Sequence, residues 1–185
     1  MTPMRTLLLL GLLASAGCGG SDTGDPPEEP QTFIALERDF QSFTAWEKFH
    51  READGSGGIH TGVDRDIYLK SRPPKGAKEF PIGTLIVKHT DGVGDPDNQG
   101  PRTFGMVKRG GDFNKAGALN WEWFELVQAD AEDPTSPWQI AWRGLGPPIG
   151  SGYGAGGSEC NSCHSEAVAN DYVEAEPLQL STLAK

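Results

Sequence analysis

The spacing of apolar residues changes once along the chain. From Phe33 through Leu36 and Phe40 to Phe43, apolar side chains recur every three or four residues, as on one face of a helix. After residue 60, short apolar runs are bounded by Gly, Pro, Asp or Asn, which is typical of strands joined by turns. These runs cover residues 65–70, 84–90, 103–108, 120–127 and 138–143. The pattern predicts an α+β fold, mainly an antiparallel β-sheet, with an N-terminal helix packed on it.

The first 17 residues have the pattern of an export signal. Arg5 precedes the apolar run LLLLGLLA, which is too short to cross a bilayer, and small residues lead up to Cys18. This resembles a bacterial lipoprotein signal, in which Cys18 is lipidated and becomes the new N-terminus, although Ser15 stands where a larger aliphatic residue is usual. The alternative is a secretory signal that is cut nearby and leaves Cys18 as a free thiol. Either way we expect a signal peptide over residues 1–17 and a protein on the periplasmic side.

A stretch rich in Pro, Gly and acidic residues follows the signal. Between Gly19 and Gln31 there is no aromatic or aliphatic side chain to bury, so the stretch cannot offset the entropy lost on ordering. We therefore predict a flexible tether over residues 18–32 and one folded domain over residues 33–185. A lipid on Cys18 would be the only membrane contact, and Gly19 in place of an aspartate favours the outer membrane.

Composition and charge narrow the classes of function. The 185 residues include 25 Gly and 14 Pro, which disfavour long helices and therefore a helical bundle. The formal net charge of −10 repels phosphate backbones, so no nucleic-acid partner is expected.

The sequence CNSCH near the C-terminus carries the clearest chemistry. Cys160 and Cys163, followed at once by His164, have the spacing of covalent haem attachment, in which both sulfurs add to the haem vinyl groups and the imidazole binds iron. We therefore predict a short haem-attachment helix and one haem c, with His164 as axial ligand. A redox Cys pair, a zinc site and a structural disulfide are the alternatives, but zinc would need a fourth ligand and a redox pair needs no histidine.

The other face of the iron has no obvious ligand. No methionine follows His164, and Met106, which lies between Phe104 and Val107, is expected in the core. The iron is then five-coordinate, and an open iron site binds or transforms small molecules rather than only relaying electrons.

At this point the chain resembles a family, the cytochrome P-460 and cytochrome c′-beta group. The matching pieces run in order through most of residues 33–173: FQSFTAWEKF, RDIYL, FPIGTLIVK, FGMVKRGGDFN, NWEWFEL, CNSCH and DYV. CNSCH alone is common to c-type haem proteins, whereas the ordered set is much more specific. Glu174 after DYV departs from the aromatic residue that is usual there.

The resemblance implies a role for Lys88. In cytochrome P-460 a lysine on the matching strand is bonded covalently to the haem edge, and Lys88 in GTLIVK is its equivalent. Such a lysine must first be neutral, which burial favours by lowering its pKa. Strand alternation places Lys88 with Thr84 and Ile86, and Leu85 and Val87 on the opposite face. Since both faces start apolar, the sequence leaves open whether Lys88 points into a pocket or into solvent.

Further pocket residues follow from the same resemblance. Arg65 matches a family arginine on the open side of the haem, where a guanidinium could hydrogen-bond a bound oxygen or nitrogen atom; the alternative is a surface arginine. His60 is a candidate distal acid or base, or simply a loop histidine. Hydroxylamine-oxidising members also use a distal carboxylate, for which Glu122, Glu125 and Asp112 are the candidates.

Two functions from different classes are compatible with these residues. The first is an oxidoreductase of cytochrome P-460 type that oxidises hydroxylamine, with nitric oxide as a second substrate, and passes the electrons to another cytochrome. The second is a cytochrome c′-beta-like protein that binds nitric oxide without turnover. A simple electron carrier would require a sixth iron ligand. Family members are commonly dimers, so the resemblance also implies a homodimer.

Overall fold

The computed structural model describes residues 31–53, 63–90, 100–148 and 159–185. The predicted signal peptide, Cys18, the tether up to residue 30 and His60 lie outside the described residues. Within the described ranges, no helix has the length and apolar character that crossing a bilayer requires.

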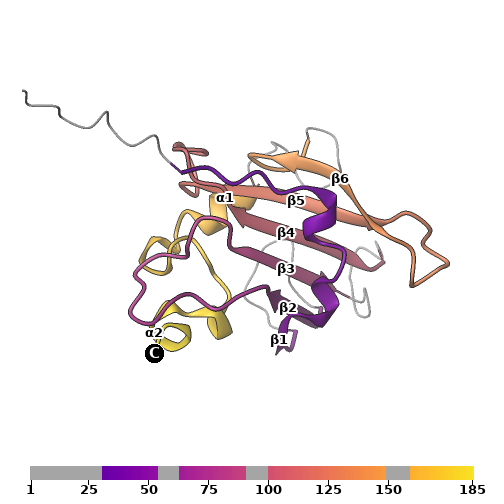
Figure 1. The fold of residues 1–185 in the computed structure, drawn as a ribbon, viewed down its shortest axis with the longest axis horizontal. Coiled ribbons are helices and arrows are strands. Elements are labelled where there is room, and N and C mark those ends of the chain that lie inside the picture. Colours follow the sequence, from indigo (N-terminus) through magenta and orange to yellow (C-terminus); the bar gives the residue numbers. More distant parts are fainter. Residues whose placement is uncertain (1–30, 54–62, 91–99, 149–158) are drawn as a thin grey trace, which may run out of the picture.

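The fold is built on a six-stranded antiparallel sheet in which each strand pairs with its neighbour in the chain (Figure 1). The strands are β1 (Glu47–Arg51), β2 (Arg65–Leu69), β3 (Leu85–Thr90), β4 (Arg102–Lys108), β5 (Trp121–Gln128) and β6 (Trp138–Gly144). All five apolar runs form strands, so the mainly antiparallel sheet predicted from the sequence is confirmed.

The predicted N-terminal helix is not seen. Residues 31–53 instead form two short 3-10 helices, η1 (Glu37–Asp39) and η2 (Phe43–Ala45), and then β1. Phe40 and Phe43 pack on one face of the sheet, whereas Phe49 packs with the core on the other face, so these rings do not share one side of a helix. The two short 3-10 helices explain the helix-like spacing of the apolar residues, because they bring Phe40 and Phe43 back onto the same face of the sheet.

Two segments cover the two faces of the sheet. On one face, Phe40, Phe43 and Ala35 of residues 31–46 pack against strand residues such as Val87 and Phe124; we call this the strap face. On the other, Val173, Leu178, Leu180 and Leu183 pack against strand residues such as Ile86 and Trp123; we call this the C-terminal face. Four short helices lie in the covering segment: α1 (Glu159–His164), η3 (Val168–Asn170), η4 (Glu176–Leu178) and α2 (Leu180–Leu183).

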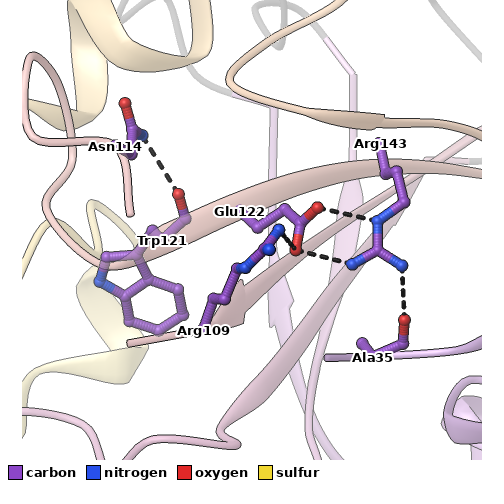
Figure 2. A network of polar contacts seen from close by, with 6 residues as sticks. All are labelled: Ala35, Arg109, Asn114, Trp121, Glu122 and Arg143. Carbon is purple, nitrogen blue, oxygen red and sulfur yellow. Dashed lines mark hydrogen bonds and ion pairs between the residues drawn. The ribbon is translucent and has the colours of Figure 1, made fainter. Parts of the chain in front are cut away.

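A buried carboxylate on the strap face ties three segments together (Figure 2). Glu122, only 2% exposed, accepts hydrogen bonds from Arg143 Nε (2.8 Å) and Nη2 (2.7 Å) and from Arg109 Nη1 (3.2 Å). Arg143 also donates to the carbonyl of Ala35 (2.6 Å) in the strap. Since buried charges require such partners, this network accounts for Glu122 as a structural residue.

Candidate functional site

The helix α1 carries the whole CNSCH motif and lies against the C-terminal face. Cys160 is half-buried and packs against the core of that face, and Cys163 is exposed. Within the described residues, neither cysteine forms a disulfide. The two cysteines therefore lie one helical turn apart, with one at the protein core and the other toward solvent.

Asn161 fastens α1 to the sheet. Its Oδ1 accepts hydrogen bonds from Asn114 Nδ2 (2.7 Å), Trp123 Nε1 (3.1 Å) and the Ala118 amide (3.3 Å). Its Nδ2 donates to Asn114 Oδ1 (3.1 Å) and to the Leu145 carbonyl (2.9 Å). We call these five hydrogen bonds the Asn161 seat. They were not predicted from the sequence, because the residues between the two cysteines of the motif carry no sequence signal for what they contact.

The seat depends on a glycine at position 117. A Cβ built there would lie 2.3 Å from Asn161 Cγ, which no side-chain contact tolerates. Gly117 therefore leaves the space that the Asn161 amide fills.

We expect Gly117→Ala to destabilise the fold by about 1–3 kcal/mol through overpacking. Asn161→Ala should cost about 2–4 kcal/mol, because it leaves the buried Trp123 N–H without its partner and leaves the Asn114 amide with the Trp121 carbonyl alone among the contacts of the described residues. Since Asn161→Ala also vacates the space that the new methyl group needs, the double variant should be no less stable than Asn161→Ala alone. Urea unfolding of the four proteins measures this coupling. Additive losses would contradict the contact.

His164 is oriented through its ring nitrogen Nδ1. Nδ1 lies 2.7 Å from the Tyr172 carbonyl oxygen, and because a carbonyl can only accept, Nδ1 carries the proton and Nε2 keeps its lone pair. The ring also packs on Trp123, with centroids 4.6 Å apart. Burial lowers the pKa of His164 to about 4, and the Lys88 charge acts in the same direction, against the raising effect of the Tyr172 bond. The imidazole is therefore neutral at pH 7, which is the form that binds metals.

Lys88 lies on the C-terminal face, beneath the segment that contains α1. It pairs with Ile67 on β2 and Phe104 on β4, and its Nζ lies 5.0 Å from the Phe104 ring centroid. Burial holds the pKa of Lys88 well below its ordinary value; the Arg65 and Arg102 charges lower it further, while Cys160 acts in the opposite direction. The sheet register thus decides what alternation left open: Lys88 points toward the motif-bearing side of the sheet.

Three more residues of interest share this face. Arg65 is 7% exposed and precedes Ile67 on the same side of β2. Glu125 on β5 pairs with Phe104 on one side and with Trp142 of β6 on the other. The register therefore places Lys88, Phe104, Glu125 and Trp142 in one row across four strands.

Among the three candidate carboxylates, only Glu125 belongs to the C-terminal face. Glu122 is on the strap face and bound by two arginines, and Asp112 is exposed and paired with Lys115 at 2.8 Å. Strand alternation along NWEWFEL predicts that Glu122 and Glu125 lie on opposite faces of the sheet. It does not tell which face is which until one residue of the strand, such as Trp123, is assigned to a face.

The residues present fit a c-type haem. Two thiols that form no disulfide among the described residues, and a neutral imidazole, lie on one short helix, which is the donor set that haem attachment requires. The buried Trp142 Nε1 on the same face has no hydrogen-bond partner among the described residues. It offers a donor to a polar group that the described chain does not supply.

Comparison of the chain with protein-family models, with curated proteins and with solved structures found no match.

Proposed function

We propose that this chain is an exported mono-haem c-type cytochrome similar to cytochrome P-460, which oxidises hydroxylamine, with nitric oxide as a second substrate. One observation carries the proposal: Cys160, Cys163 and a neutral His164 share one helix, and this helix packs against the sheet face on which Lys88, Arg65 and Glu125 lie.

On the protein side, the two thiols would form the covalent attachment and the imidazole would bind the iron. Each thiol would add across a haem vinyl group, so that a carbon–sulfur bond forms and the thiol proton moves to the neighbouring carbon. His164 would hold the iron through Nε2, because its Nδ1 already donates to the Tyr172 carbonyl. When bound, the haem would supply an iron centre that takes electrons from the substrate.

Each polar residue of the C-terminal face would have a different role toward the substrate or the haem. Glu125 would accept a proton as hydroxylamine is oxidised, since a half-buried carboxylate can act as a general base. Arg65 would donate hydrogen bonds to the oxygen or nitrogen of the substrate. Burial favours the neutral form of Lys88, which would lie beside the haem edge, where the matching lysine of cytochrome P-460 is bonded to the ring.

We also propose where the protein is located and which partners it has. Residues 1–17 would be removed on export, and a lipid on Cys18 would hold the domain at the outer membrane, on its periplasmic side. There the electrons would pass to another cytochrome, and two copies of the chain would associate as a homodimer.

The experiment is an absorption spectrum of the protein made in a host that matures c-type haem. Haem should stay bound after denaturation and acid–acetone extraction, and a variant with both Cys160→Ala and Cys163→Ala should lose it completely. A protein without covalent haem would overturn the proposal.

The ferrous spectrum distinguishes three functions: hydroxylamine oxidation, nitric oxide binding and simple electron transfer. A strongly red-shifted Soret band that Lys88→Ala abolishes would establish the link to the haem edge and favour hydroxylamine oxidation. An ordinary five-coordinate spectrum, with nitric oxide bound but not consumed, would favour the binding protein. A six-coordinate spectrum would favour a simple electron carrier.

A further inference from the structure

The carbonyl that orients His164 lies in a strained turn. Asp171 and Tyr172 have φ angles of 51° and 66°, in the left-handed region that costs a non-glycine residue roughly 1–2 kcal/mol. Two such residues in succession persist only where surrounding contacts hold them.

The contacts that hold this turn come from the sheet and from the segment before β3. The Asp171 carboxylate binds Lys108 Nζ of β4 at 2.5 Å through one oxygen and accepts the Phe80 amide at 2.8 Å through the other. The Asp171 carbonyl accepts Trp121 Nε1 of β5 at 2.8 Å. The side chains of Lys108 and Asp171 are only 3% and 4% exposed.

A buried ion pair contributes little net stability to a protein core. Apolar residues of similar volume are often as stable or more stable, because ions lose their hydration on burial. An ion pair instead fixes the positions of its two side chains. Here it fixes Asp171, and Tyr172, whose carbonyl accepts the His164 hydrogen bond, is the next residue in the chain.

We infer that Lys108 and Asp171 are a positioning pair that sets the orientation of the His164 ring through the Asp171–Tyr172 turn. The chain of contacts is continuous: Lys108 on β4 binds Asp171, Asp171 fixes the turn, and the Tyr172 carbonyl accepts His164 Nδ1 at 2.7 Å. The inference rests on the proposed haem function, since the ring it orients is the iron ligand in that proposal.

The test is the iron–histidine stretching band in the resonance Raman spectrum of the ferrous haem-loaded protein. Asp171→Asn and Lys108→Met should shift this band to lower frequency and broaden it. The ratio of histidine-bound to histidine-free haem should fall about tenfold, because outer partners of a histidine ligand typically contribute 10- to 100-fold to metal binding.

Two further variants separate positioning from loss of stability. Glu122→Gln perturbs a buried ion network on the strap face, opposite the face on which Lys108 binds Asp171, and should leave the band unchanged. The double variant K108M/D171N removes both charges; it should recover stability relative to Asp171→Asn and still show the shifted band. The double variant also keeps the test decisive if a single variant does not fold.

The two proposals fail in different ways. An unchanged band in Asp171→Asn and in the double variant, or the same shift in Glu122→Gln, would overturn the positioning pair alone. A wild-type protein with no covalent haem has no band in any variant, and this would overturn the proposed function and with it the inference.

Discussion

Glu122→Ala should lower the free energy of unfolding by about 3–5 kcal/mol, as is typical when one partner of a buried ion network is removed. Glu122 is 2% exposed and is the shared acceptor of Arg143 and Arg109. Without it, two guanidinium groups keep their charge on the strap face, and Arg143 retains only the Ala35 carbonyl among the contacts drawn in Figure 2. Urea unfolding followed by tryptophan fluorescence measures the loss.

A matched control shows whether burial is responsible. Asp112→Ala removes a carboxylate whose ion pair with Lys115 is exposed, and we expect a change within about 0.5 kcal/mol. Adding Arg143→Met to Glu122→Ala should restore part of the stability, because one unpaired charge is removed as well. A loss below about 1 kcal/mol in Glu122→Ala would show that the arginines find other partners.

The second large effect concerns Lys88 in the haem-free protein. The folded chain releases the Lys88 proton well below the ordinary pKa, mainly because of burial, whereas the unfolded chain keeps it up to about pH 10.4. Between these limits the unfolded state binds the extra proton, so the unfolding free energy rises with pH, by at most about 1.4 kcal/mol per unit. Lys88→Met should remove this slope and be more stable than wild type at pH 7.

Urea unfolding between pH 6 and 10 gives the difference between the two proteins, which should shrink as the pH approaches about 10.4. Lys75→Met removes a lysine at an exposed position and should follow the wild-type profile. A Lys88→Met protein with the same slope as wild type would mean that Lys88 is charged and hydrated in the folded state.

The local pattern of the sequence was sufficient for five of the six strands, but it did not predict β1. The short apolar runs between Gly, Pro, Asp and Asn correspond to β2 to β6, because turn residues and strand-forming side chains act over only a few positions. The spacing of Cys160, Cys163 and His164 places them on about one turn of helix wherever that helix packs. The same locality explains the wrong N-terminal helix: spacing alone does not distinguish a continuous helix from successive three-residue turns with Phe40 and Phe43 returning to one surface.

What the tertiary structure decided is which residues meet. Lys88 could face either side of β3 until the packing of the C-terminal segment distinguished the faces, and the register placed Glu125 in its row and Glu122 behind the sheet. The seat of Asn161 and the pair of Lys108 with Asp171 join residues 47 and 63 positions apart. Such contacts depend on strand pairing and on where a distant segment packs, and neither leaves a periodic trace in the residues themselves.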